Sequence, residues 1–314
     1  MKSFKLYVLL FSLFLCACNT KNKDGKTDTI TTGTISIAVD EGFKPIIEEE
    51  LAVFEGLYPE ADIKPTYCNE VDAINSLLKD SVRLVVTTRR LSLKETQSLN
   101  SRKFFPVETK LAIDGVGLIV NNQNPDSLIT VEQVRKILTG EITKWKDIYP
   151  NSKLGDIQVV FDNPNSSTVR FAKDSICLGK SFASKRINAQ KNNLQVFDYV
   201  SKTPNSIGVI GVNWLGVRSD TTNLSFKKDV RVLAVSEEDV ATPANSFKPY
   251  QAYLALGDYP FSRDVYVIVT DPRQGLPSGL SIFLTTDRGQ RIILKSGLVP
   301  ATQPVRIVTV KDEF

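Results

Sequence analysis

The chain has 314 residues, a formal net charge of +4, an apolar content of 42% and no histidine. This composition is ordinary for a globular protein, and no basic run interleaved with aromatic residues points to nucleic-acid binding. Without histidine, Ser-His-Asp and Cys-His catalysis and the usual histidine-containing zinc sites are excluded. We therefore expect no cofactor and no metal.

The first residues have the layout of an export signal. Two lysines precede an apolar run over residues 6–15, which is shorter than the roughly 20 residues that span a bilayer. The motif Leu15-Cys16-Ala17-Cys18 resembles a bacterial lipobox, which implies cleavage before Cys18 and a lipid on its thiol. We expect a signal peptide over 1–17 and a flexible, polar tether over 18–33. The alternative is ordinary secretion, in which Cys18 is removed with the signal peptide or remains without a lipid.

The first part of the folded chain alternates between strand and helix patterns. Apolar runs predict strands over 35–39, 63–67 and 83–88, and the spacing of apolar residues predicts helices over 44–57 and 71–78. Asn69 is a good capping residue for the second helix. This β-α-β-α-β order indicates a mostly parallel sheet covered by helices.

A long strand over 111–121 leads into a second set of elements. Thr130 and Gln133 form a capping box that starts a helix ending at Leu138. Further helices are predicted over 166–177, 194–200, 278–285 and 287–295, and strands over 157–161, 207–212, 230–235, 265–270 and 305–310. We expect two α/β lobes. Cys68 and Cys177 can form a disulfide or remain separate buried thiols.

Several motifs in a shared order resemble the phosphate-specific periplasmic binding proteins of ABC importers (PstS type). The matching segments are Ala112-Ile-Asp-Gly-Val-Gly-Leu-Ile-Val-Asn121, Ile137-Leu-Thr-Gly-Glu-Ile-Thr-Lys-Trp145, Ser166-Ser-Thr168 with Arg170, Ser206-Ile-Gly-Val-Ile-Gly211, Tyr259-Pro-Phe-Ser-Arg263 and Gly297-Leu-Val-Pro300. The resemblance implies a type II periplasmic-binding-protein fold, with a ligand cleft between two lobes. It places 34–112 and 262–314 in lobe I and 113–261 in lobe II.

The segment Asn163-Pro-Asn-Ser-Ser-Thr168 is a turn that leads directly into a helix. Free backbone N–H groups and the positive end of a helix dipole favour anions at such a start. Ser166, Ser167 and Thr168 can add hydroxyl donors, and Arg170 can add charge. The alternative is that a serine only caps the helix. The resemblance favours contact with the ligand.

Three further residues fall in the register of the family's ligand site. Thr88 and Arg89 follow the third strand, and ligands of open α/β sheets bind beyond the carboxyl ends of strands. Arg89 can instead face solvent beside Arg90. Asp114 corresponds to the family's cleft aspartate, which implies that it accepts the proton of a protonated oxyanion. Its alternative role is to cap the turn before Gly115.

Other positions depart from the family pattern by carrying acidic residues. Asp40-Glu41-Gly42 stands where the family offers hydroxyls, Glu70 lies in the place of a glycine-rich loop, and Asp162 replaces an arginine found in some members. Unpaired carboxylates repel a bare oxyanion. Either these side chains face solvent or pair with Arg83, Arg89 and Arg170, or the ligand is not plain phosphate.

The resemblance implies a solute-binding protein and not an enzyme. It would deliver phosphate or a related small oxyanion to an ABC transporter permease, from the periplasmic side of the cell envelope, where its lipid holds it to a membrane. We expect a monomer with no nucleic-acid partner. The same fold with a zwitterionic or cationic ligand, or with a sensing or structural role, is the alternative. A hydrolase that uses two of the cleft carboxylates ranks last, because no spacing singles out a pair.

Overall fold

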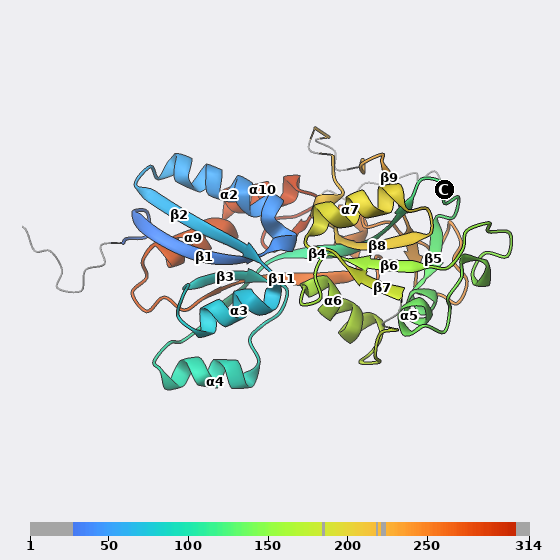
Figure 1. Cartoon of the computed structure of the whole chain (residues 1–314). Helices are drawn as coiled ribbons and strands as arrows, with labels where there is room; N and C mark the ends of the chain where they lie inside the picture. Colours follow the sequence, from blue (N-terminus) through green and yellow to red (C-terminus); the bar gives the residue numbers. More distant parts are fainter. Residues whose placement is uncertain (1–27, 184–185, 218, 221–223, 306–314) are drawn as a thin grey trace, which may run out of the picture.

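The computed structural model describes residues 28–183, 186–217, 219–220 and 224–305. The predicted signal peptide, Cys18 and most of the predicted tether lie outside the described residues, as does nearly all of the strand predicted over 305–310. None of the described helices has the length and apolar character needed to cross a membrane. The chain forms two α/β lobes, which lie end to end in Figure 1.

Lobe I is a sheet with helices on both faces. Its strands follow the order β2-β1-β3-β11-β4, in which β1 runs parallel to β2 and β3, and β11 runs antiparallel to β3 and β4. The strands are β1 (Gly33–Asp40), β2 (Ala61–Cys68), β3 (Leu84–Thr87), β11 (Ser262–Val269) and the first part of β4 (Val107–Asn121). The helices are α2 (Lys44–Leu57), α3 (Glu70–Leu78), α4 (Leu93–Ser101), α9 (Leu276–Thr285) and α10 (Asp287–Lys295).

The lobe I strands are buried on both faces, which explains their continuous apolar runs. Ile37 and Val39 of β1 pack into the core under α2 and α9, and Ala38 between them packs into the core under α3. Successive side chains of a strand point to opposite faces, so one short apolar segment serves both cores. The predicted β-α-β-α-β order is confirmed in this part of the chain.

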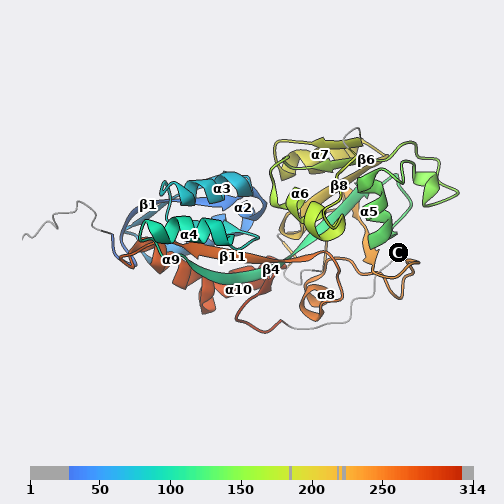
Figure 2. The same cartoon turned by 90° about the horizontal axis from the view of Figure 1, so that it is seen from below.

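Two long strands join the lobes. Residues of β4 up to Gly115 pair with β11, and residues from Val116 pair with β8 and β9 of lobe II. Figure 2 shows β4 and β11 running from one lobe towards the other. Asp114 and Arg263 lie opposite each other on these strands, just before β4 leaves lobe I.

Lobe II has a second sheet and its own core around the fully buried Trp145. Its strands are β8 (Ser206–Gly211), β6 (Gln158–Phe161), β7 (Ile187–Ala189), β9 (Val230–Val232) and the separate pair β5 (Leu128–Thr130) and β10 (Ala234–Ser236). Its helices are α5 (Val131–Thr139), α6 (Ser167–Phe171), α7 (Asn193–Lys202) and α8 (Gln251–Leu256), with short helical turns at η3 (Trp145–Asp147), η4 (Ala172–Ile176) and η6 (Val212–Trp214). A further short turn, η2 (Glu41–Phe43), follows β1 in lobe I.

Most predicted elements are present, with differences at their ends. The predicted helix over 166–177 begins as α6 and continues into a π-helical turn at η4. The short helix α8 was not predicted, and the last described strand is β12 (Val299–Pro300), which pairs with β4. Cys68 and Cys177 are both unpaired. The residue limits of the two lobes stay a prediction.

Candidate functional site

The candidate site lies where the carboxyl ends of the lobe I strands meet lobe II. Because β1, β2 and β3 are parallel, the residues that follow them gather at one edge of the sheet. The start of α6 approaches this edge from lobe II, as the contacts of Ser167 and Arg170 described below show. The predicted site residues thus come from elements far apart in the sequence.

Arg263 lies at the centre of this region. It is only 6% exposed, and its Nε and Nη2 donate to Asp114 Oδ2 at 3.0 and 2.8 Å. Its Nη1 donates to Ser167 Oγ of lobe II at 3.0 Å. Burial raises the pKa of Asp114, and the charge of Arg263 opposes that rise. Arg263 therefore links the crossing strands to the α6 start.

The three hydroxyls at the start of α6 have different roles. Ser166 is the N-cap, and its Oγ accepts from the Val169 N–H at 3.3 Å, as the capping alternative predicted. Thr168 Oγ1 donates to Asp162 Oδ1 at 2.6 Å. Ser167 is the hydroxyl that meets lobe I. All three residues are buried, and each hydroxyl has a hydrogen-bond partner within the protein.

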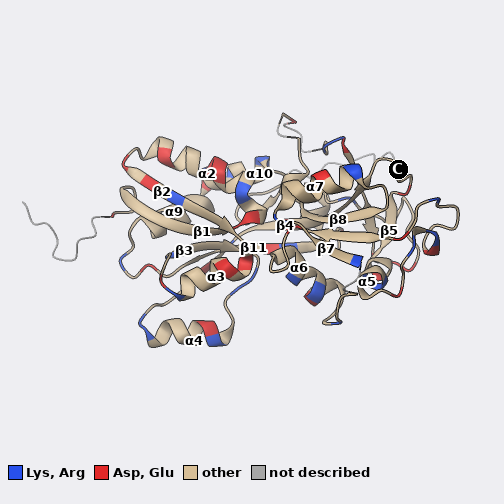
Figure 3. Ribbon diagram, in the orientation of Figure 1, with Lys and Arg blue, Asp and Glu red and all other residues tan. Residues whose placement is uncertain are grey.

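Glu70, Thr88 and Arg170 form a second contact between the lobes. Glu70 is 2% exposed, and its Oε1 accepts from both the N–H and the Oγ1 of Thr88, each at 2.8 Å. Arg170 Nε of lobe II donates to Glu70 Oε2 at 2.6 Å. Burial alone would raise the pKa of Glu70, but the hydrogen bond and charge of Arg170 and the two hydrogen bonds from Thr88 together outweigh it, so the pKa is lowered. In Figure 3, acidic positions near the start of α3 face the basic positions of α6 and of the η4 turn that follows it.

The segment Asp40–Gly42 also lies in the interface between the two lobes. Asp40 Oδ1 accepts from the Gly42 N–H at 3.0 Å, and Oδ2 is buried with no hydrogen-bond partner among the described residues. Burial raises the pKa of Asp40 to about 7, against the charge of Arg263. Glu41 Oε2 accepts from Asn193 of lobe II at 2.5 Å, and burial raises its pKa.

The backbone of η2 makes one more contact with lobe II. The Gly42 carbonyl accepts from Asn213 Nδ2 and from Trp214 Nε1, both at 2.9 Å. A Cβ at Gly42 would lie 3.3 Å from Asp40 Oδ1 and 3.9 Å from Arg263 Nη2, so a side chain here would crowd the site. The predicted Gly42 is therefore a packing position.

Arg89 does not join the other predicted residues. Its two terminal nitrogens donate to the two carboxylate oxygens of Glu95 in α4, each at 2.8 Å. Arg83 pairs with Asp80 and Asp271, on the far side of lobe I. Of the three arginines considered as partners for the acidic replacements, only Arg170 fills that role.

A cavity of about 170 Å³ opens beside the interface. It is lined by Asp40, Glu41, Tyr67, Cys68, Asn69, Asp162, Asn163 and Lys191. The interface as a whole holds more carboxylates than guanidinium groups. The acidic side chains are Asp40, Glu41, Glu70, Asp114 and Asp162, and the guanidinium groups belong to Arg170 and Arg263. No cluster of metal-ligating side chains occurs in the part of the chain that the structure describes.

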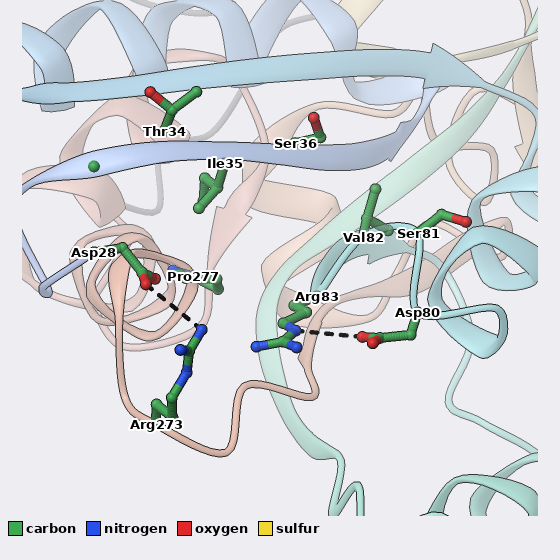
Figure 4. Close-up of a pocket in the computed structure, with 11 residues that line it drawn as sticks. Asp28, Thr34, Ile35, Ser36, Asp80, Ser81, Val82, Arg83, Arg273 and Pro277 are labelled. Atoms are coloured by element: carbon green, nitrogen blue, oxygen red, sulfur yellow. Dashed lines mark hydrogen bonds and ion pairs between the residues drawn. The ribbon is translucent and has the colours of Figure 1, made fainter. Parts of the chain in front are cut away.

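A larger hollow of about 460 Å³ lies at the opposite end of lobe I (Figure 4). Arg83 and Arg273 extend into it, but Arg83 pairs with Asp80 and Arg273 pairs with Asp28. Asp271 also binds the backbone of the adjoining loop, through Gly275 N–H. These ion pairs and hydrogen bonds hold the loop in place. Both arginines already have carboxylate partners, so neither guanidinium is unpaired and available to a ligand. The interlobe region is the better candidate.

Sequence reasoning missed Arg263 and Asn193 as site residues. Arg263 ends the quoted Tyr259-Pro-Phe-Ser-Arg263 motif, so a signal for it was present. Asn193 follows Asn192, which is the N-cap of α7, and no local pattern distinguishes its side chain. Its amide nitrogen lies 2.5 Å from Glu41 Oε2 and 3.4 Å from Asp162 Oδ2, and thus links both lobes.

Two α/β lobes joined by crossing strands, with charged side chains meeting between them, define the class of two-lobed binding proteins. Residues 24–288 match the model described as the PBP superfamily domain, and the chain belongs to this superfamily. The predicted fold class and family resemblance are confirmed.

Individual relatives agree with this assignment. The phosphate-binding protein PstS of Borreliella burgdorferi is 24% identical over 307 residues, which cover 94% of this chain and 98% of that protein. PstS of Pseudomonas aeruginosa is 22% identical over 277 residues, or 82% and 80% of the two chains. A putative phosphate ABC transporter substrate-binding protein from Clostridium perfringens, solved with bound phosphate, has a TM-score of 0.69 and 19% identity, and the match covers 86% of this chain and 100% of that chain. The structural likeness shows the fold.

Proposed function

We propose that this chain is the solute-binding component of an ABC importer and binds phosphate, or a closely related small oxyanion, between its lobes. The relatives named above are phosphate-binding proteins, and one was solved with phosphate. The observation that carries the proposal is Arg263, a buried guanidinium that contacts Ser167 at the α6 start and Asp114 on the crossing strand. Planar guanidinium groups are well suited to binding phosphate oxygens.

The protein would work outside the cytoplasm, held to a membrane by a lipid on Cys18. The Leu15-Cys16-Ala17-Cys18 motif supports the anchor, and the permease of the importer would be the partner that receives the ligand. We propose no catalytic role, because the named relatives are binding proteins.

The buried carboxylates suggest how the site would select its anion. Asp114 Oδ1 and Asp40 Oδ2 are buried and lack a hydrogen-bond partner among the described residues. A ligand that carries a proton on oxygen, such as hydrogen phosphate, could donate to one of them. Sulfate is fully ionised at neutral pH and has no proton to donate, so it would leave the acceptor unsatisfied and be repelled.

Isothermal titration calorimetry of the purified protein with phosphate, sulfate and a set of amino acids tests this proposal. We expect heat from phosphate and none from sulfate. Arg263→Lys keeps the charge but loses the fork that contacts Asp114 and Ser167 together, so it should weaken phosphate binding at least tenfold. Absence of phosphate binding in the unmodified protein would contradict the proposal.

A second candidate is a zwitterionic or cationic solute in the same cleft. It is favoured by the cavity of about 170 Å³, whose lining includes Asp40, Glu41 and Asp162. An ammonium group there would offset part of the excess negative charge. In the same titrations, binding of a basic amino acid with no response to phosphate would select this candidate.

A further inference from the structure

Glu70 is an acidic replacement that contacts predicted site residues of both lobes, Thr88 and Arg170. It is the first residue of α3, directly after the N-cap Asn69, and its carboxylate points away from the helix towards β3 and α6. The side chain is almost fully buried, unlike most glutamates in the first turn of a helix.

The Glu70 carboxylate accepts hydrogen bonds from Thr88 and Arg170, two residues that the family resemblance places in contact with a bound anion. Thr88 gives Glu70 its N–H and its hydroxyl, and Arg170 gives its Nε. Arg170 Nη2 also donates to Thr88 Oγ1 at 2.8 Å and to the Thr88 carbonyl at 3.1 Å, which completes the network. A carboxylate is itself an oxyanion, so it satisfies these groups as a phosphate oxygen would.

The same network joins the two lobes. Glu70 and Thr88 belong to lobe I, Arg170 belongs to lobe II, and 100 residues separate Glu70 from Arg170 in the chain. Charge-assisted hydrogen bonds in a buried setting are among the stronger polar contacts in proteins. An incoming anion that uses Thr88 and Arg170 must break these bonds before it gains its own.

We infer that Glu70 is a built-in competitor of the ligand: its carboxylate occupies part of the anion site and holds the lobes together until an anion displaces it. The inference rests on the proposed function, because it names what the ligand must displace. It makes Glu70 a residue that lowers affinity and sets the phosphate concentration at which the protein loads.

The experiment compares the unmodified protein with Glu70→Gln, Glu70→Asp and a matched control, Glu132→Gln. Glu132 also lies in the first turn of a helix and pairs with an arginine, Arg135, but in α5 of lobe II. Phosphate affinity is measured by calorimetry, and lobe closure by small-angle X-ray scattering with and without phosphate. Glu70→Asp keeps the charge while shortening the side chain by one methylene, which separates occupancy of the site from charge repulsion.

We expect Glu70→Gln to bind phosphate at least tenfold more tightly than the unmodified protein, and Glu132→Gln to be unchanged. In the absence of phosphate, both Glu70 variants should expand relative to the unmodified protein and contract when phosphate is added. Unchanged affinity and unchanged size in both Glu70 variants would overturn the inference. Tighter binding by Glu70→Gln, with Glu70→Asp identical to the unmodified protein in both measurements, would also overturn it, because charge repulsion alone would then explain the effect.

The proposed function can fail separately. If no variant binds phosphate, the proposed ligand is wrong, while expansion of the phosphate-free Glu70 variants would still support the contact between the lobes. If the phosphate-free variants stay as compact as the unmodified protein, the contact does not hold the lobes, whatever the ligand.

Discussion

Asp40 makes the stability of the protein depend on pH in a way that one substitution should remove. Its carboxylate is 1% exposed, and burial raises its pKa from 3.8 to about 7. The folded protein therefore binds this proton more tightly than the unfolded chain does. As a result, the free energy of unfolding falls as the pH rises from about 4 to about 7. Asp40→Asn keeps the acceptor for the Gly42 N–H and cannot ionise.

The size of this change in stability follows from the rise in the pKa of Asp40. One pKa unit corresponds to about 1.4 kcal/mol, so a rise from 3.8 to about 7 amounts to roughly 4 kcal/mol. Near pH 4 the unmodified protein and Asp40→Asn should have similar stability. Above pH 7 the variant should be more stable by up to about 4 kcal/mol, or roughly 8 °C in Tm at about 2 °C per kcal/mol.

Thermal unfolding in phosphate-free buffers at pH 4.5 and 8.5 measures this difference. The control is Asp229→Asn, which removes the same charge from an exposed position and should have a small, pH-independent effect. An equal change in Tm for Asp40→Asn at both pH values, or a lower Tm at pH 8.5, would show that Asp40 does not retain its proton in the folded state.

Three further predictions follow from other residues. Glu50 is fully buried, both its oxygens lack partners among the described residues, and burial raises its pKa from 4.5 to about 9. Glu50→Gln should therefore stabilise the protein at pH 7 by up to about 3 kcal/mol in urea unfolding, and a destabilised variant would refute this. Ser167→Ala and Thr168→Ala should each weaken phosphate binding about tenfold or more in calorimetry, and unchanged affinity in both would move the site elsewhere. Cys18→Ser should release the protein from the membrane fraction or leave its signal uncleaved. Labelled fatty acid in that variant would contradict the anchor.

The sequence predicted the fold well where local patterns determine structure. The alternation of Ile37, Ala38 and Val39 between two cores follows from strand geometry. Asn69 caps α3, and Thr130 and Gln133 form the predicted capping box of α5. Hydrogen bonds of this kind join residues three apart, so a short stretch of sequence contains all the information they need.

The site was less predictable because its contacts join distant segments. The pairing of Arg263 with Asp114 depends on the register of β11 against β4, which includes an irregularity between Val265 and Tyr266. The contact of Glu70 with Arg170 requires two lobes to meet. Arg89 shows the opposite case, because its partner Glu95 is only six residues away.

Trp214 donates a hydrogen bond to the Gly42 carbonyl across the interface, so its fluorescence should report separation of the two lobes. Trp214 belongs to η6 of lobe II, and Gly42 belongs to η2 of lobe I. The chain has 2 tryptophans, and the other, Trp145, is fully buried in the lobe II core. Separation of the lobes would expose the indole of Trp214 to water and shift its fluorescence to longer wavelength, while Trp145 would keep a constant emission. Separation and closure of the lobes could then be followed in real time in the unlabelled protein.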